Sequence, residues 1–468
     1  MNFRFKIFHK TWGLVRYLLL ILPWFVCLDN GSIQLEEGSP YQPNIIIIMA
    51  DDLGYGDLSS FGGDGTIHTP YIDRLVEGGL KMTDFHSNGV VCSPTRASLL
   101  TGLYPQEAGI ASVVTARHHR HTGMSPNKYT LAEFLKESGY RTGMFGKWHL
   151  GYQPEYGPVV QGFDHFQGFV SGNIDYFSHI DQEGYPDWWQ QKKLHPQEGY
   201  LTNLITDHGL EFMDHAQDKP FFLYLAHGAP HYPLQGPGDK AYRTAHGDFQ
   251  VAGDRSNKFD TYRAMIEFLD SNIGRIITYL EDKALLENTL IMFFSDNGAT
   301  KTVGSNHPFR GAKSSVYEGG HRVPAVFYWE NVIEPGTSDA LVLTMDIFPT
   351  IVDLIDSDLS DTSSMSGLSV VSLWMNPQLR SRKNQASRTV FWRWLANKQT
   401  GYQKAVRQNH WKLIINQEGT ALYNLEKDPG EMRNVSRIHP DKAQELSQVL
   451  EEWEATIKDS EMTVKIKK

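Results

Sequence analysis

The stretch that decides the fold is Asn44-Ile45-Ile46-Ile47-Ile48-Met49-Ala50-Asp51-Asp52. Its unbroken apolar, largely β-branched run predicts a strand buried on both faces, as in the centre of a parallel sheet. Two adjacent carboxylates follow the strand, where they repel one another unless a cation lies between them. The stretch therefore favours a cation site at the sheet edge over a solvated turn.

Apolar strands and amphipathic helices alternate along the chain on both sides of this stretch. Strands are expected at 44–49, 140–145, 220–226, 290–294 and 324–329, and helices at 69–79, 93–102, 130–139, 200–215, 261–282 and from 344. This alternation predicts an α/β protein with a largely parallel sheet sandwiched by helices. After an Asp- and Ser-rich loop at 357–366, strands at 388–394, 410–415 and 420–425 and a helix at 440–457 predict a smaller antiparallel unit.

Polar side chains follow four of the predicted strands. They are Asp51 and Asp52, Lys147 and His149, His231, and Asp296 and Asn297. Because ligand sites of such sheets lie at the carboxyl ends of the strands, we expect these residues to meet in one pocket. The oxygen-bearing members predict a calcium site and disfavour zinc or copper, while magnesium remains possible on the ligands alone.

A short helix is predicted at Cys92-Ser93-Pro94-Thr95-Arg96-Ala97-Ser98-Leu99-Leu100-Thr101-Gly102. Ser93 suits the N-cap and Gly102 suits the end of the helix. Cys92 then lies where free N–H groups favour negative charge, and Arg96 adds a cation in the first turn. A nucleophile beside such an anion site suits attack on a sulfate or phosphate ester.

Composition and the N-terminus indicate an exported protein that does not bind nucleic acid. Charged residues precede an apolar run from Leu18 to Cys27, which predicts a signal peptide at 1–34, with an uncleaved anchor as the alternative. We expect a secreted or periplasmic enzyme with no membrane span after signal removal. Of two cysteines, only Cys92 then remains. The net charge of -10 argues against a nucleic-acid partner.

The motifs together resemble one known family. Cys92-Ser93-Pro94-Thr95-Arg96 with Thr101-Gly102 is similar to the Cys-x-Pro-x-Arg…Thr-Gly signature of the type I, formylglycine-dependent sulfatases, which include arylsulfatases and polysaccharide sulfatases. Thr95 replaces the commoner serine. The resemblance extends over 43–435, through Gly146–Gly151, Arg310–Lys313, Glu318–Pro324 and Leu422–Glu431. It implies an alkaline-phosphatase-like fold, with a catalytic domain at 43–365 and a small C-terminal subdomain at 366–468.

The same resemblance implies a modified nucleophile and a metal. A maturation enzyme would oxidise Cys92 to formylglycine, also called 3-oxoalanine. The implied calcium ligands are Asp51, Asp52, residue 92, Asp296 and Asn297.

Charge stabilisation and proton transfer are assigned by the same matches. Arg96, Lys147 and Lys313 would bind and stabilise the sulfate. His149 would be the base that acts on the formylglycine hydrate. His231 would protonate the leaving oxygen, with His227 as its rival.

Several loops are open to more than one interpretation. The aromatic-rich segment 168–200 is either a sugar platform or a packed loop, and its Ser171 and Asn173 are candidate sulfate contacts. The His-rich stretch Arg117–His121 is a solvated loop or a rim contact to an anionic substrate, in preference to a metal cluster. These loops and Trp392–Trp394 would set specificity for a sulfated carbohydrate.

Three functions are compatible with the sequence. A sulfatase of sulfated sugars or polysaccharides agrees best with the motifs. The alternatives are a phosphonate monoester or phosphodiester hydrolase on the same scaffold, and a catalytically silent sugar-binding relative.

Overall fold

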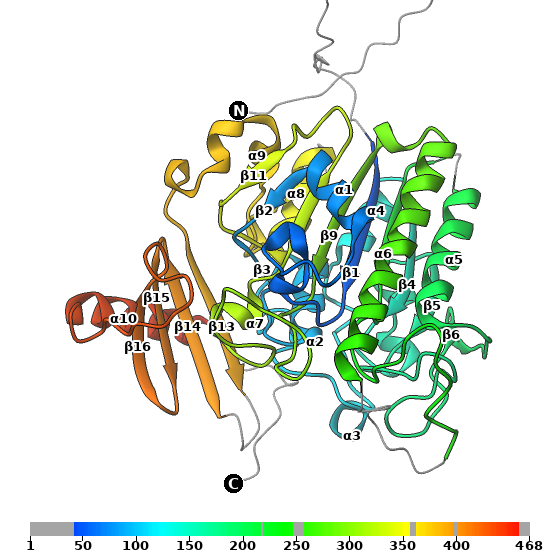
Figure 1. Cartoon of the computed structure of the whole chain (residues 1–468), viewed down its shortest axis with the longest axis horizontal. Helices are drawn as coiled ribbons and strands as arrows, with labels where there is room; N and C mark the ends of the chain where they lie inside the picture. Colours follow the sequence, from blue (N-terminus) through cyan, green and yellow to red (C-terminus); the bar gives the residue numbers. More distant parts are fainter. Residues whose placement is uncertain (1–41, 217–218, 247–256, 356–361, 396–400, 458–468) are drawn as a thin grey trace, which may run out of the picture.

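A computed structural model describes residues 42–216, 219–246, 257–355, 362–395 and 401–457 (Figure 1). The expected signal peptide at 1–34 and part of the expected loop at 357–366 lie outside these ranges. None of the helices within them is both long and apolar enough to cross a membrane.

A ten-stranded sheet forms the large unit, in the order β11-β2-β10-β9-β1-β8-β4-β5-β6-β7. Five neighbouring strands at its centre run parallel: β9 (Thr289–Ser295), β1 (Asn44–Ala50), β8 (Phe221–Ala226), β4 (Arg141–Lys147) and β5 (His165–Phe169). The flanking strands are mostly antiparallel: β10 (Ala325–Tyr328), β2 (Leu80–Met82), β11 (Gly336–Ser338), β6 (Trp189–Gln190) and β7 (Lys193–Leu194). The predicted mixed, largely parallel sheet is confirmed.

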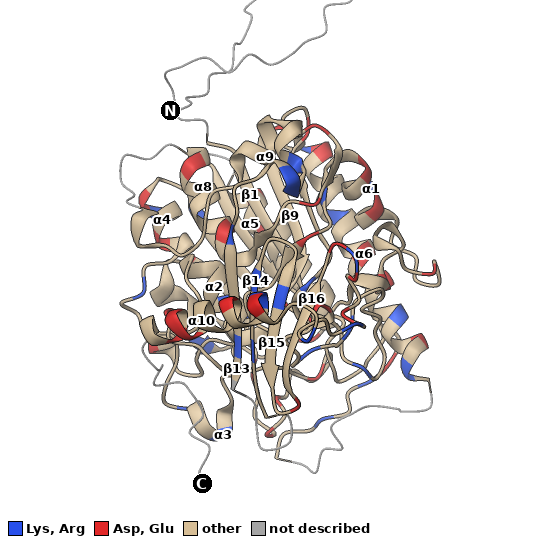
Figure 2. Ribbon diagram, turned by 90° about the vertical axis from the view of Figure 1, so that its left-hand side faces the viewer, with Lys and Arg blue, Asp and Glu red and all other residues tan. Residues whose placement is uncertain are grey.

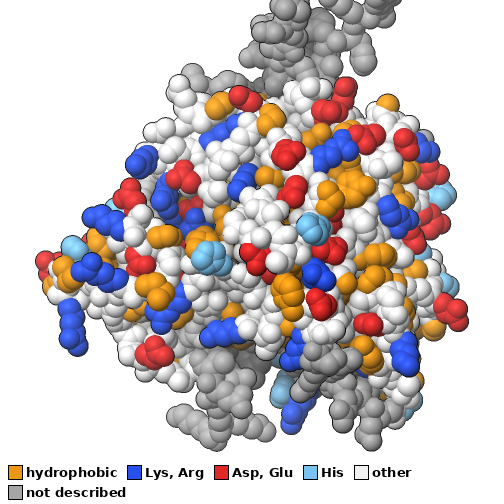
Figure 3. Space-filling model, viewed as in Figure 1, with side chains coloured by type: hydrophobic (Ala, Val, Ile, Leu, Met, Phe, Trp, Pro, Cys, Tyr) orange, Lys and Arg blue, Asp and Glu red, His pale blue; other side chains and the backbone are white. Residues whose placement is uncertain are grey.

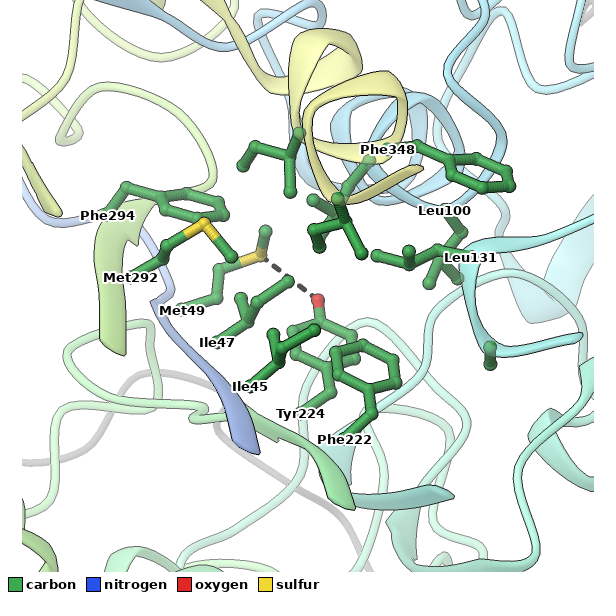
Figure 4. Close-up of a cluster of buried hydrophobic side chains, with 14 of the residues drawn as sticks. Ile45, Ile47, Met49, Leu100, Leu131, Phe222, Tyr224, Met292, Phe294 and Phe348 are labelled. Carbon is green, nitrogen blue, oxygen red and sulfur yellow. Dashed lines mark hydrogen bonds between the residues drawn. The ribbon is translucent and has the colours of Figure 1, made fainter. Parts of the chain in front are cut away.

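Strand β1 divides the core because its side chains alternate between the two faces. Ile45, Ile47 and Met49 pack with α2 (Cys92–Thr101), α4 (Leu131–Glu137) and α8 (Ile347–Ile355) (Figure 4). Ile46 and Ile48 pack on the other face with α1 (Pro70–Gly78), α5 (Leu201–His215) and α6 (Lys258–Asp282). Burial of each isoleucine contributes about 2 kcal/mol, so helices on both faces hold β1 and the carboxylates after it in place.

A four-stranded antiparallel sheet forms the C-terminal unit. Its strands are β13 (Thr389–Leu395), β14 (Tyr402–Gln408), β15 (Trp411–Asn416) and β16 (Gly419–Asn424). Helix α10 (Pro440–Thr456) lies against this sheet (Figure 2). The sequence predicted only three of these strands. It missed β14 because Lys404 and Arg407 interrupt its apolar pattern, and Arg407 is buried at 0% exposure.

Residues just after the expected domain boundary pack with the large unit. Leu373 and Trp374, in α9 (Val371–Met375), belong to the core cluster that contains Ile45 and Phe348. The division into 43–365 and 366–468 stays a prediction.

Short elements complete the described chain. They are β3 (Phe85–His86), β12 (Val342–Leu343), α3 (Ala116–His119), α7 (Glu318–His321) and the 3-10 turns Tyr55–Asp57, Ser59–Phe61, Pro154–Tyr156, Pro158–Gln161, Leu286–Asn288, Thr344–Asp346, Thr362–Ser364, Pro377–Arg380 and Arg382–Asn384.

A buried ionic network joins the two units. This junction cluster consists of Asp84, His86, Glu318 and His321 from the large unit and Arg407, Lys412 and Glu431 from the C-terminal unit. Arg407 donates to Asp84 Oδ1 at 2.9 Å. Lys412 Nζ lies 2.8 Å from Glu318 Oε1 and 2.9 Å from Glu431 Oε1. Because a buried charge needs a partner, these pairs fix how the small sheet docks.

Candidate active site

The strand-end residues meet at the carboxyl edge of the large sheet. Asp51 and Asp52 follow β1, Asp296 and Asn297 follow β9, Lys147 ends β4, and His231 lies in the loop after β8. A cavity of about 480 Å³ opens here, and Cys92, His149, His231 and Lys313 line it. The four motif groups that the sequence placed at strand ends therefore lie at one site.

Three carboxylates and three cations form the site cluster beneath this cavity. Lys147 donates to Asp51 Oδ2 at 2.6 Å, and Lys313 donates to Asp52 Oδ1 at 2.6 Å. Arg96 donates to Asp296 Oδ2 at 2.8 Å and is itself 1% exposed. Every charge of this cluster is thus held by a partner from a different segment of the chain.

The carboxyl groups of the site cluster differ in their affinity for protons. Burial favours the neutral form of Asp52, but Lys313 and His231 nevertheless lower its pKa. Burial and the neighbouring Asp51 raise the pKa of Asp296. Two buried acids of the same cluster thus shift in opposite directions, because Asp52 lies against Lys313 and His231 whereas Asp296 lies near a second carboxylate.

A hard cation fits the residues between β1 and β9. Asn297 Oδ1 is buried and has no hydrogen-bond partner among the described residues, while Asn297 Nδ2 donates to Asp52 Oδ1 at 2.7 Å. Ligand atoms of Asp51, Asp52, Cys92 and His231 all lie within 4.8 Å of one another. An orphaned amide oxygen beside carboxylates is a donor set that calcium or magnesium can use.

Cys92 is the first residue of α2, and it is 3% exposed. Its Sγ lies 3.4 Å from Asp51 Oδ1 and 3.3 Å from Lys313 Nζ. Burial and the charge of Asp296 raise the pKa of the thiol to about 12. The unmodified side chain is thus a neutral thiol at physiological pH and a poor nucleophile.

The predicted cap of α2 is wrong, although its predicted end is confirmed. The helix begins at Cys92 with Val91 as the N-cap residue, and Ser93 Oγ instead accepts a hydrogen bond from Val114 N at 3.1 Å. That contact ties the start of α2 to the pocket wall. Gly102 ends the helix with φ of 68°, a conformation that glycine adopts readily.

Two histidines face the cavity with defined tautomers. His149 Nε2 lies 3.0 Å from the Val114 carbonyl, which can only accept, so Nε2 carries the proton. His149 Nδ1 is buried, has no hydrogen-bond partner in the described part of the chain, and can accept a proton. Burial and Lys147 hold the pKa of His149 well below its ordinary value. The neutral ring of His149 therefore presents an unprotonated Nδ1.

His231 has the opposite arrangement. Its Nδ1 donates to the Tyr232 carbonyl at 2.7 Å, and its Nε2 lies 3.6 Å from Asp52 Oδ2. The rival His227 is 1% exposed and does not line the cavity, and burial lowers its pKa to about 3. The structure brings His231 into the cavity and leaves His227 outside it.

The structure shows where the aromatic segment 168–200 and the His-rich stretch lie relative to the cavity. In the aromatic segment, Tyr176 and Trp188 are each 1% exposed and belong to the core, so these two rings pack and do not form a sugar platform. Ser171 donates to the Asn173 carbonyl at 3.0 Å, and Asn173 alone of the pair lines the cavity. His118 lines the cavity as a rim residue.

The candidate metal-binding groups of the described residues lie away from the His-rich stretch. Within the described residues, the two groups of side chains close enough to share a metal contain none of Arg117–His121. The second group, His86 with Glu318 and His321, belongs to the junction cluster, where Lys412 Nζ lies 3.1 Å from His321 Nε2. A lysine thus occupies the position that a metal would need.

Sequence reasoning missed part of the cavity wall. Thr115, Gln182 and Tyr232 line the cavity. Tyr232 follows His231 directly, so the motif itself could have pointed to it. Thr115 and Gln182 lie in irregular loops, where no periodicity indicates which side chains face inward.

Comparisons with known proteins identify the family of this chain. Residues 43–357 match the family model described as Sulfatase, and residues 309–459 match one described as N-sulphoglucosamine sulphohydrolase, C-terminal. N-acetylgalactosamine-6-sulfatase of Canis lupus familiaris is 29% identical, covering 90% of this chain and 87% of that protein. Arylsulfatase A of Homo sapiens is 30% identical, covering 87% of each.

Solved structures show the same architecture. The crystal structure of Ps i-CgsB superposes with a TM-score of 0.78 at 29% identity, covering 91% of this chain and 95% of that one. Fold, site and relatives together define a sulfuric ester hydrolase. The chain belongs to the sulfatase family, whose model spans most of its length.

Proposed function

We propose that this enzyme hydrolyses sulfate esters of carbohydrates, with a formylglycine formed from Cys92 and a bound calcium ion. One observation carries the proposal: Cys92 Sγ lies at the start of α2, within 3.4 Å of Asp51 and 3.3 Å of Lys313, at the cavity. Relatives support a carbohydrate substrate, because a structure 28% identical to this chain is of Ps i-CgsB with k-i-k-neocarrahexaose bound.

The calcium ion would be held by Asp51, Asp52, Asp296, Asn297 and residue 92. Bound calcium supplies positive charge against the sulfate oxygens, and oxidised residue 92 supplies a hydroxyl nucleophile as its hydrate.

Unmodified side chains stabilise charge in the transition state and carry out the proton transfers. Lys147, Lys313 and Arg96 bring fixed positive charge against the oxygens that gain negative charge in the transition state. Because Nδ1 of His231 already donates to the Tyr232 carbonyl, the ring must first take up a second proton at Nε2. Nε2 then gives that proton to the departing sugar oxygen, which makes it a better leaving group. His149 accepts a proton at Nδ1 as sulfate is released.

Mass spectrometry of the peptide that contains Cys92 tests the nucleophile. We expect an active preparation to carry the aldehyde at position 92, and a preparation with only the thiol to be inactive. Full activity from a sample that contains thiol alone would contradict the proposal. Parallel assays with an aryl sulfate and an aryl phosphodiester separate a sulfatase from a phosphodiesterase on the same scaffold, and we expect the sulfate to be preferred.

Metal removal tests the cation. After dialysis against a chelator, we expect activity to fall by at least about 100-fold and to return with calcium more fully than with magnesium. The Cys92→Ala variant provides a matched control, because calcium should still raise its melting temperature without restoring turnover. Undiminished activity in the metal-free enzyme would exclude the ion from the reaction.

Export and maturation complete the proposal. The signal at 1–34 would direct the enzyme to the periplasm or the medium, and N-terminal sequencing of exported protein checks the cleavage. Because Cys92 is 3% exposed, a formylglycine-generating enzyme would reach it only before the chain folds.

A further inference from the structure

The cavity has a charged end and an uncharged wall. Cys92, His149, His231 and Lys313 form the end that receives the sulfate. We call the other lining residues the outer wall; they are Val91, Ser112, Val113, Val114, Thr115, His118, Gly172, Asn173, Gln182, Tyr232, Ser314 and Trp394. Within the described part of the chain, the outer wall contains no Lys, Arg, Asp or Glu.

Two arginines near this wall are already engaged. Arg120 pairs with Glu183 at 2.8 Å. Arg243 is 1% exposed and donates to Asn173 Oδ1 at 2.7 Å, so it holds the asparagine from behind. Charged side chains of both signs are spread over the face of the molecule in Figure 3, so the lack of charge on the outer wall is a local property.

Neutral polar groups take the place of charges on the outer wall. Asn173 Nδ2 donates to Gln182 Oε1 at 3.1 Å, and Tyr232 Oη donates to the same oxygen at 3.4 Å. Thr115 adds a hydroxyl, and Trp394 adds an aromatic ring. Amides and hydroxyls match sugar hydroxyl or acetamido groups, whereas a ring face suits the C–H face of a sugar.

We propose that the sugar ring bearing the scissile sulfate carries no second negative charge. Its class is a monosulfated neutral hexose or N-acetylhexosamine, in preference to a uronate or a disulfated ring. The inference rests on the proposed function. Its physical basis is that a second carboxylate or sulfate would lose hydration at the outer wall and find no cation in exchange. Specificity of this kind arises from the penalty on the wrong ligand.

Matched substrates test the inference. For each sulfate position on a galactose, glucose or N-acetylgalactosamine ring, the monosulfated compound is compared with the same ring carrying a second sulfate or a C6 carboxylate. Sulfate release is measured at the same pH for every compound. We expect kcat/KM for the best neutral ring to exceed that of its charged counterparts by at least about 10-fold.

An aryl sulfate, assayed in parallel, distinguishes failure of the proposed function from failure of the inference about the sugar ring. Failure to hydrolyse it would refute the proposed function itself. If it is hydrolysed, equal rates on charged and uncharged rings, including equal failure on both, would overturn only the inference about the ring.

A gain-of-function variant makes the test sharper. Gln182→Arg brings a cation to the outer wall, and we expect it to raise kcat/KM for the disulfated ring relative to the neutral ring by about 10-fold. Gln182→Met is the matched control, since it has similar size and no charge, and it should give no such gain. Equal ratios in the two variants, with aryl sulfate still hydrolysed, would also overturn the inference.

Discussion

Two buried ionic clusters in this molecule look alike in composition but differ in what surrounds them. The site cluster and the junction cluster both combine acids with Lys and Arg, and their members are buried apart from Lys313, whose side chain is 16% exposed. At the junction, Arg322 and Arg407 overcome burial and hold the pKa of Asp84 well below its usual range. Each cluster also holds one acid whose pKa burial raises, Asp296 at the site and Glu431 at the junction, so the pKa values alone do not separate the two clusters. At the site, however, an oxygen of Asn297 has no hydrogen-bond partner among the described residues. Unsatisfied groups beside a cavity, and not buried charge itself, distinguish the reactive cluster.

The largest expected effect separates activity from stability at the site. Cys92→Ala should lower kcat for an aryl sulfate by at least about 10⁴-fold, because it removes the nucleophile. The melting temperature should change by no more than about 2 °C, since few atoms are lost. Ser98→Ala is the matched control and should keep activity, because this buried hydroxyl lies on the same helix and has no hydrogen-bond partner among the residues that the structure describes. Turnover by the Cys92 variant would remove the basis of the proposed mechanism.

The junction should give the reverse result. Asp84→Asn leaves the guanidinium of Arg407 buried with a weaker partner, so the free energy of unfolding should fall by about 3–5 kcal/mol. Activity assayed well below the melting temperature should stay within about 2-fold of wild type. Denaturant unfolding measures the loss. The exposed Asp260→Asn is the control, and a loss of similar size there would show that junction burial is not the cause.

Two tryptophans on one strand sharpen the comparison further. Trp392 is 1% exposed, donates to the Ser87 carbonyl at 2.9 Å and stacks on His321. Trp392→Ala should therefore cost about 3–5 kcal/mol of stability. Trp394 lines the cavity, so Trp394→Ala should lower kcat/KM for a sugar sulfate by about 10-fold with a smaller loss of stability. If the two variants lowered stability equally and lowered kcat/KM equally, the proposed difference between junction and site would be wrong.

The smallest expected effect is a change in pH dependence. Burial raises the pKa of Glu431 from 4.5 to about 7. The folded protein then binds this proton more tightly than the unfolded chain, so the contribution to stability is complete below pH 4.5 and is lost as the pH rises toward 7. Glu431→Gln removes this titration, and the fall in unfolding free energy over that window should shrink by about 1–3 kcal/mol. Parallel stability profiles of variant and wild type would show that Glu431 does not titrate there.

Much of the fold and the convergence of the site followed from the sequence, because both depend on local pattern. The run Ile45–Met49 required burial on two faces, and parallel strands then placed Asp51, Lys147 and Asp296 at one edge. The roles of these residues stay predictions that the assays above address.

The parts that sequence reasoning missed depend on distant partners. Arg407 made β14 look unlike a strand, yet its charge is met by Asp84, which lies 323 positions away. Ser93 was expected to cap its own helix, but its Oγ instead accepts a hydrogen bond from Val114 N. Gln182 faces the cavity from an irregular loop. Sequence patterns over a few residues cannot predict such contacts, because each contact forms between segments that only the complete fold places side by side.

Strand β13 carries Trp392 and Trp394 two positions apart, and so on the same side of the small sheet. This spacing constrains how descendants of the enzyme can change. We expect substitution at 394 to alter the sugar that is accepted while 392 continues to hold the two units together. Insertion of one residue between them would turn one ring to the opposite face. Related enzymes with other substrate preferences should therefore differ in β13 by substitutions and not by insertions or deletions.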